Sequence, residues 1–220
     1  MWPLLQVSSK RSRALLVFSK SAERGNVKTR LRPVLTEEQC LALHLALLKD
    51  TIERVMQIEA RHYLYLSSDV PLPFASAIPL RLQSGSDLGQ RMENAFRETL
   101  AEHQSVLIVG TDSPALHPSV FNDAFAALDS SDLVLGPTED GGYYLIAARS
   151  VIPEAFHDIP WGTPEVLSQT LKATGSRKVT LLPAHYDVDQ PADLQRLMED
   201  RQNLAFAPNT LAWLQTYYAR

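Results

Sequence analysis

Short apolar runs alternate along this chain with longer stretches of helical spacing, and this alternation constrains the fold more than any other feature. The runs lie at Ala14–Phe18, His62–Leu66, Ser105–Gly110, Asp132–Gly136 and Tyr143–Ala147. Each run has the length of a buried strand. Strands that alternate with helices favour a mainly parallel sheet with helices on both faces. We therefore expect an α/β protein, a three-layer αβα sandwich with a Rossmann-like sheet.

Helix start signals stand between these runs. Thr36-Glu37-Glu38-Gln39 is a capping box, and Asp87 can cap a second helix. Three further helices are expected over Pro118–Leu128, after Thr163-Pro164 and after Gln190-Pro191. In such a sheet, ligands bind beyond the carboxyl ends of the strands, so the loops at that edge are the candidate site.

Charge and length exclude several classes of protein. The 220 residues carry 21 Lys and Arg against 25 Asp and Glu, and no basic cluster occurs beyond Lys10, Arg11 and Arg13, so a nucleic-acid partner is not expected. No run approaches the about 18 apolar residues of a membrane span, and none resembles a signal-peptide core. We expect a single domain over residues 1–220, a cytoplasmic location and no membrane span; the sequence does not indicate the oligomeric state.

Thiol and imidazole groups give no metal site. The single cysteine, Cys40, can form no internal disulfide and lacks the companions of a zinc site. The six histidines match none of the metal-ligand spacings. His44 lies on the apolar stripe of a helix and is assigned no role.

The loop after the first run, Lys20–Leu31, is rich in positive charge. Four cations fall within eleven positions, together with one glycine, Gly25. Main-chain N–H groups and such cations can wrap an anion, although the phosphate-loop and dinucleotide spacings are both absent. A solvated basic surface loop is the alternative. The position directly after the first strand favours the anion site.

Carboxylates follow three other predicted elements. Asp112 stands at the tip of the Ser105–Gly110 run, where it could bind Mg²⁺ or cap a turn before Pro114. Glu139-Asp140-Gly141-Gly142 allows a tight hairpin or a close approach of the backbone to a ligand. Asp187 and Asp189 share one face of an extended segment, so either could reach a metal while the other caps the next helix.

Six motifs occur together, in order, over roughly residues 14 to 195. They are Phe18-Ser19-Lys20 with Gly25–Leu31, Asp87–Met92, Gly110–Leu116, Leu135-Gly136-Pro137 with Glu139–Ile146, Pro160–Thr163, and Asp187-Val188-Asp189 with Pro191 and Asp193-Leu194. The set resembles a bacterial, glycosyltransferase-like family of the nucleotide-diphospho-sugar transferase superfamily, which has the GT-A fold. Its better-understood relatives resemble 2-phospholactate and molybdenum-cofactor guanylyltransferases. Ala22 departs from the pattern, since the family usually has proline there.

The resemblance implies roles for particular residues. The loop that contains Lys20, Gly25 and Thr29 would cradle the phosphates of a nucleotide, with Lys28 and Arg30 neutralising the transferring and leaving phosphates. Gln83, Asp87 and Gly89 would lie near the base and ribose. Asp112 would bind Mg²⁺ or Mn²⁺, with Asp189 as the second, distal ligand. The residues beside a small-molecule acceptor would be Asp140, Gly141, Gly142 and Trp161.

Three functions remain open at this point. The first is nucleotidyl transfer from a nucleoside triphosphate to a phosphate or phosphonate acceptor, with release of pyrophosphate. The second is glycosyl transfer from a nucleotide-sugar; such enzymes commonly carry Asp-x-Asp where this chain has Thr111-Asp112-Ser113, and the literal Asp-x-Asp lies downstream at residues 187–189. The third is a non-catalytic nucleotide-binding module. A single aspartate after the strand, Asp112, with its partner Asp189 far downstream, favours nucleotidyl transfer.

Overall fold

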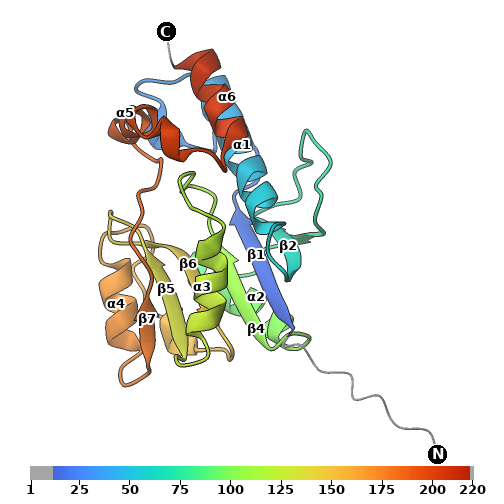
Figure 1. Cartoon of the computed structure of the whole chain (residues 1–220), viewed down its shortest axis with the longest axis vertical. Helices are drawn as coiled ribbons and strands as arrows, with labels where there is room; N and C mark the ends of the chain where they lie inside the picture. Colours follow the sequence, from blue (N-terminus) through green and yellow to red (C-terminus); the bar gives the residue numbers. More distant parts are fainter. Residues whose placement is uncertain (1–11, 219–220) are drawn as a thin grey trace, which may run out of the picture.

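A computed structural model describes residues 12–218. Seven strands form one sheet in the order β3-β2-β1-β4-β6-β5-β7 (Figure 1). The strands are β1 (Arg13–Ser19), β2 (Arg61–Leu66), β3 (Leu80–Leu82), β4 (Ser105–Val109), β5 (Leu133–Pro137), β6 (Tyr143–Ala148) and β7 (Val179–Leu181). All pairings are parallel except those of β6, which is antiparallel to β4 and β5. The five predicted runs are therefore strands, whereas β3 and β7 were not expected.

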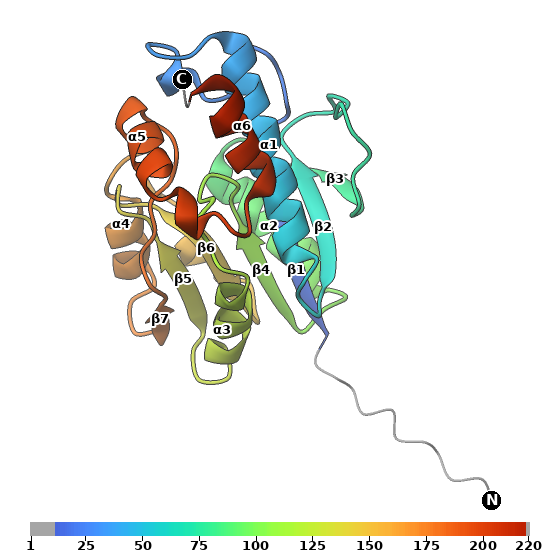
Figure 2. The same ribbon diagram turned by 45° about the horizontal axis from the view of Figure 1, so that its top comes forward.

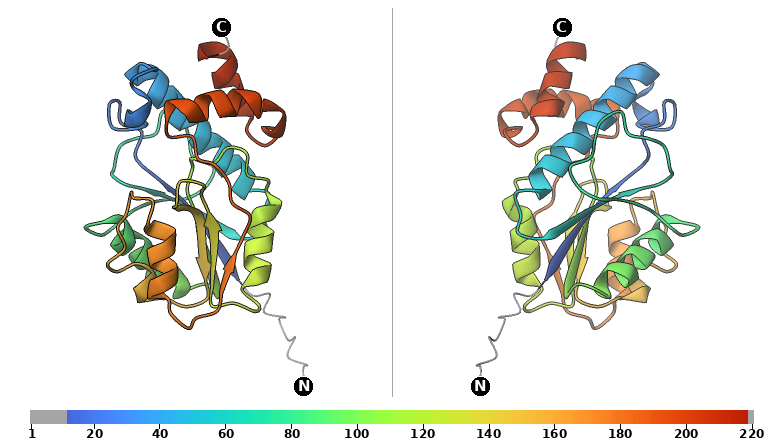
Figure 3. Two further views of the ribbon diagram at one scale, coloured as in Figure 1. Left: turned by 90° about the vertical axis from the view of Figure 1, so that its left-hand side faces the viewer. Right: turned by 90° about the vertical axis from the view of Figure 1, so that its right-hand side faces the viewer.

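Helices cover both faces of the sheet, as Figure 3 shows with the sheet nearly edge-on. The helices are α1 (Glu37–Val55), α2 (Leu88–Leu100), α3 (Ser119–Ala127), α4 (Val166–Ala173), α5 (Pro191–Glu199) and α6 (Pro208–Tyr217), with short 3₁₀ helices η1 (Thr29–Leu31), η2 (Pro153–Ala155) and η3 (Arg201–Asn203). The three-layer αβα sandwich is confirmed.

The burial pattern follows from the alternation of side chains along the strands. Leu15 and Val17 of β1 pack with α1 and α3 on one face. Leu16 and Phe18 pack with α2 on the other, where side chains of α4 lie against the same cluster. Successive residues of a strand point to opposite faces, so one continuous apolar run supplies two cores.

A third apolar cluster lies above the edge of the sheet. It joins Leu31 after the basic loop, the first half of α1, Val188, α5 and α6. Figure 2 shows α6 running beside α1, and the indole Nε1 of Trp213 donates to the carbonyl oxygen of Gln39 at 3.1 Å. This cluster fixes the basic loop and the segment around Val188 on the same side of the molecule.

Two of the predicted caps are present, whereas Thr163 does not cap α4, because that helix begins at Val166 with Glu165 at its N-cap position. Thr36 and Gln39 form the capping box of α1, and the Asp87 side chain accepts from the backbone N–H of Gln90 at the start of α2. No helix among residues 12–218 combines the length and apolarity needed to cross a membrane.

Candidate functional site

A cleft of about 710 Å³ opens at the edge of the sheet where the strand order changes direction. The chain runs outward from β1 to β3 on one side of the sheet and returns to β4 on the other side of β1. Ligands bind at such switch points in open α/β sheets. Because β6 runs opposite to its neighbours, the turn between β5 and β6 reaches the same edge.

Lys28 lies at the centre of this cleft. Its backbone is left-handed, with φ of 49° and ψ of 37°, directly before η1. The ammonium nitrogen Nζ donates to Asp112 Oδ1 at 2.5 Å and to the carbonyl oxygen of Val188 at 2.7 Å, and the side chain is 3% exposed. Val27 and Leu31, both buried, hold the loop on either side. The lysine therefore joins three segments of the chain that are distant in sequence.

Asp112 follows β4 and faces the cleft with 44% of its side chain exposed. Within residues 12–218 no backbone N–H donates to its carboxylate, so the side chain does not cap the turn before Pro114. Burial favours the neutral acid, but the charge and hydrogen bond of Lys28 outweigh it and hold the pKa of Asp112 below its usual range. The carboxylate is therefore charged and open to the cleft.

Asp187 and Asp189 point to different partners. Ser113 Oγ donates to Asp187 Oδ1, whereas Arg30 Nη1 lies 2.8 Å from Asp189 Oδ2. Burial and the negative charge of Asp112 raise the pKa of Asp187 to about 7. The carboxyl group of Asp187 is therefore close enough to Asp112 for the charge of Asp112 to change its pKa.

Neither of the two caps α5. The carboxylate of Asp193, in the first turn of that helix, accepts from the backbone N–H groups of Asp189 and Gln190 at 2.9 and 2.6 Å. The expectation that one of the pair would serve as the cap is therefore wrong, because Gln190 and Asp193 form their own capping box.

Three of the four residues predicted near the acceptor, Asp140, Gly141 and Gly142, lie in the β5–β6 turn, and the fourth, Trp161, lies between η2 and α4. Asp140 Oδ1 accepts from Thr138 Oγ1 at 2.6 Å and from the backbone N–H of Gly142 at 3.2 Å. Gly141 has φ of +92° and packs so closely on Pro164 that a Cβ has no room. Asp140, Gly142 and Trp161 line the cleft, as do Lys20 and Arg30. Thr29 lines its polar part together with the four aspartates.

The residues predicted near base and ribose are divided. Gln83 lines the cleft, but its Nε2 donates to the carbonyl oxygens of Ser19 and Tyr65, both at 3.0 Å. Asp87, Gly89 and Gly25 are not among the residues that line the cleft. Asp87 caps α2, Gly89 packs against the 156–161 segment, and Gly25 has φ of +86° in the basic loop.

Two residues that matter to the site were missed from the sequence. His44 of α1 lines the cleft, and its Nε2 lies 3.0 Å from the carbonyl oxygen of Lys20; burial lowers its pKa. Arg54, 1% exposed, donates from Nη1 to the carbonyl oxygens of Ser113 and Pro114, both at 3.0 Å. Each looked like an ordinary helix residue, and no local signal distinguishes it.

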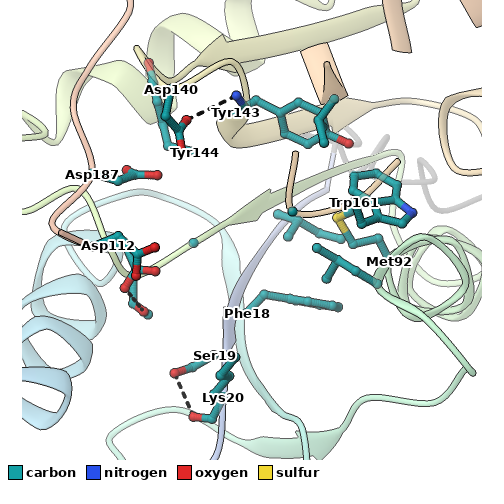
Figure 4. A pocket seen from close by; sticks show the side chains of 18 of the residues that line it. Phe18, Ser19, Lys20, Met92, Asp112, Asp140, Tyr143, Tyr144, Trp161 and Asp187 are labelled. Carbon is teal, nitrogen blue, oxygen red and sulfur yellow. Dashed lines mark hydrogen bonds between the residues drawn. The ribbon is translucent and has the colours of Figure 1, made fainter. Parts of the chain in front are cut away.

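The carboxylates offer hard oxygen ligands, but they do not form a complete metal cage. In the described part of the chain no three His, Cys, Asp or Glu side chains gather closely enough to hold a metal ion. Figure 4 shows Asp112, Asp187 and Asp140 on one side of the cleft. The negative charge of Asp112 raises the pKa of Asp187, and a divalent cation between the two carboxylates would relieve this repulsion. These residues therefore fit Mg²⁺ or Mn²⁺ with further ligands from substrate or water.

Comparison with known families shows to which family this chain belongs. The model of one family, described as "Uncharacterized protein conserved in bacteria (DUF2064)", matches residues 34–163. The chain belongs to the DUF2064 family. A search of the curated proteins gave no match.

Solved structures share the fold of this DUF2064 protein. A structure from Desulfovibrio desulfuricans G20, provisionally named a nucleotide-diphospho-sugar transferase, is 30% identical, covers 94% of this chain and 95% of its own, and has a TM-score of 0.85. CMP:2-keto-3-deoxy-manno-octonic acid synthetase complexed with CTP is 12% identical, with coverage of 87% and 98% and a TM-score of 0.56.

A glycosyl transferase is also among the matches. Glucosyl-3-phosphoglycerate synthase from Mycobacterium tuberculosis, in complex with Mn²⁺, uridine-diphosphate and glucosyl-3-phosphoglycerate, is 12% identical, with coverage of 92% and 81% and a TM-score of 0.52. At this identity the last two structures show a shared fold. The neighbours are thus nucleotidyl and glycosyl transferases, and kinship with guanylyltransferases remains a prediction.

Proposed function

We propose that this protein is a divalent-metal-dependent transferase that acts on a nucleotide. The observation that carries the proposal is the cluster of Lys28, Asp112 and Asp187 at the switch point of the sheet. The buried ammonium of Lys28 donates to the Asp112 carboxylate, and its charge also acts on the carboxyl of Asp187, which lies on a separate segment. Positive charge for phosphate and oxygen ligands for a metal are the groups that phosphoryl-type transfer requires.

The reaction we favour is nucleotidyl transfer. An acceptor phosphate or phosphonate oxygen attacks the α-phosphorus of a nucleoside triphosphate, the bond to the bridging oxygen breaks, and pyrophosphate leaves with that oxygen. Lys28 and Arg30 neutralise the phosphates, and the loop around them orients the triphosphate for in-line attack. A bound Mg²⁺ would act as a Lewis acid on the phosphate oxygens.

Asp112 is the proposed first metal ligand, and the contacts favour Asp187 over Asp189 as the second. Asp187 feels the charge of Asp112, whereas Asp189 is paired with Arg30. Asp189 was the partner implied by family resemblance. Substituting each by asparagine distinguishes them: Asp187→Asn weakens Mg²⁺ binding at least about tenfold, and Asp189→Asn leaves it within about twofold.

Glycosyl transfer is the second candidate, favoured by the fold shared with glucosyl-3-phosphoglycerate synthase. The melting temperature measured with Mg²⁺ and each triphosphate or nucleotide-sugar separates the two, because a ligand that binds only the folded state stabilises it. A triphosphate that stabilises the protein where nucleotide-sugars do not supports nucleotidyl transfer; the reverse supports glycosyl transfer.

The control for this experiment is a matched pair of variants. Asp112→Asn removes the Mg²⁺-dependent part of the shift, and Asp69→Asn, at an exposed aspartate outside the cleft, keeps it. A protein that no nucleotide stabilises, with or without Mg²⁺, contradicts the proposal.

A further inference from the structure

The part of the cleft between α2 and β6 has an apolar wall. Its side chains are those of Phe18, Leu88, Met92, Ile108, Tyr143 and Trp161. Figure 4 shows Phe18, Met92 and Trp161 across the cleft from the carboxylates of Asp112 and Asp187. The cleft therefore has a charged side and an apolar side, and a single ligand that spans it meets both.

The apolar wall is held in place by packing. Met92 and Ile108 are only 5% and 3% exposed, and Tyr143 packs edge-to-face on Trp161 with ring centroids 6.1 Å apart. Leu88, at 43%, is exposed. The buried part of this wall is already shaped for a ligand, so binding requires little ordering of the Met92 and Ile108 side chains.

One polar side chain beside this wall is held by the backbone, since Arg91 Nε donates to the carbonyl oxygen of Gly85 at 3.1 Å. The side chains of Phe18, Met92 and Ile108 offer no hydrogen-bond partner. A polyol placed against them would lose water from its hydroxyls, which disfavours sugar-like groups there.

The acceptor is the substrate part that must reach this wall. Under the proposed function the triphosphate lies on the basic loop around Lys28, and the attacking oxygen lies beside its α-phosphorus near Asp112. The rest of the acceptor then extends into the free part of the cleft, towards Met92 and Trp161. We infer that the acceptor carries, next to its phosphate or phosphonate, an apolar group of about the size of a phenyl ring or a branched alkyl chain.

The nucleobase is a poorer occupant of the same space. Its edges carry hydrogen-bond donors and acceptors, which the apolar wall does not satisfy. Where β1 and β2 end, the cleft is lined by the polar side chains of Ser19, Ser67 and Gln83 instead. We therefore assign the base to that polar end.

Calorimetric titration tests this inference, which rests on the proposed function. The protein is saturated with Mg²⁺ and a non-hydrolysable nucleoside triphosphate, and phenyl phosphate and glycerol phosphate are then titrated separately. Phenyl phosphate is expected to bind about tenfold tighter or more, because its ring is buried on the apolar wall.

Matched variants locate the effect. Leu88 lies in the cleft and is exposed, so glutamine is tolerated there, and Leu88→Gln reduces the preference for phenyl phosphate over glycerol phosphate to about twofold. Leu82 of β3 is similarly exposed but lies outside the cleft, and Leu82→Gln keeps the preference. Met92→Gln gives a second test deeper in the wall if the variant folds.

Three results would overturn the inference. Equal affinity for the two phosphate esters, with the triphosphate still bound, removes the apolar-acceptor assignment and leaves the proposed function intact. Competition of a phosphate-free nucleoside with phenyl phosphate reassigns the wall to the base. Failure of the triphosphate itself to bind overturns the proposed function and the inference together.

Discussion

Lys28 Nζ lies 2.5 Å from Asp112 Oδ1, and the lysine side chain is almost wholly buried. The ammonium thus neutralises the carboxylate that we propose as a metal ligand. A divalent cation and the lysine compete for the same oxygen, while a triphosphate and the lysine attract each other. Removal of this one charge therefore has opposite effects on the two ligands.

Lys28→Met is expected to raise the affinity for Mg²⁺ roughly tenfold, because Lys28 no longer competes with the metal for the carboxylate of Asp112. The same variant is expected to lower the affinity for a nucleoside triphosphate about tenfold or more. Calorimetric titration of each ligand alone measures both values. Arg24→Met, which removes an exposed cation from the same loop, leaves both within about twofold. Mg²⁺ affinity that falls in Lys28→Met contradicts this account.

Asp187→Asn is expected to stabilise the protein at pH 8 and not at pH 4. The pKa of Asp187 is raised to about 7 by burial and by Asp112, above that of an unfolded aspartate. Near pH 4 the folded-state carboxyl is protonated and carries no charge penalty. Between pH 4 and pH 7 the unfolded state releases the proton that the folded state keeps, so the stability falls as the pH rises and levels off above 7, where the charged carboxylate destabilises the fold by about 1–2 kcal/mol. The Asp187→Asn variant keeps this stability, because asparagine carries no charge.

Urea unfolding at pH 4.5, 6 and 8 measures the difference. Asp69→Asn is the control, because it shows how the loss of one exposed negative charge alone changes the free energy of unfolding. Saturating Mg²⁺ at pH 8 stabilises the wild-type protein and closes the gap, because the cation compensates the charge of the carboxylate. A variant that is equally stabilised at pH 4.5 and pH 8 argues against a shifted Asp187.

Much of the fold follows from local signals in the sequence. The Thr36 capping box and the Asp87 cap act within four residues, so the pattern predicts them without knowledge of the rest. The strand β3 was not predicted because Leu80 and Leu82 at the sheet edge are 45% and 47% exposed, so the sequence contains no buried apolar run there. Edge strands depend on a neighbouring strand that the local pattern does not include.

The site could be predicted only in part. Lys28 and Asp112 follow β1 and β4, and the topology of a parallel sheet brings such loops together. The direction of the Asp187 side chain depends on Ser113, 74 positions away, and is invisible to local spacing. Arg54 lies four residues after Asp50, a spacing typical of an exposed ion pair, yet both side chains are buried.

Arg54→Met is expected to destabilise the fold by about 3–5 kcal/mol. The guanidinium donates to three carbonyl oxygens of the loop after Asp112, those of Ser113, Pro114 and Leu116, and methionine leaves them buried without donors. The loss of these anchors also frees Asp112, so Mg²⁺ affinity falls. Arg54→Lys retains the charge without the planar fork and recovers only part of the stability.

Chemical denaturation with urea measures this change, and Arg149→Met is the control. Arg149 is 41% exposed at its side chain and pairs loosely with Asp129 at 3.6 Å, so its loss costs under about 1 kcal/mol. An Arg54→Met protein as stable as the control would show that the three carbonyl oxygens find other donors.

Gly89→Ala tests the packing that places Trp161 in the cleft. A Cβ at position 89 would overlap the carbonyl oxygen of Phe156 and lie 2.7 Å from Trp161 Nε1, so the 156–161 segment must move. Helix propensity alone predicts a gain of up to about 1 kcal/mol from alanine in α2. We expect overpacking to dominate, with a net loss of about 1–3 kcal/mol and weaker binding of phenyl phosphate.

Gly110→Ala, whose Cβ would meet its nearest neighbour at 3.8 Å, is the matched control for stability and is expected to unfold near the wild-type urea midpoint. If Gly89→Ala is instead more stable than the wild type, helix propensity outweighs the contact, and α2 does not fix the position of the tryptophan ring.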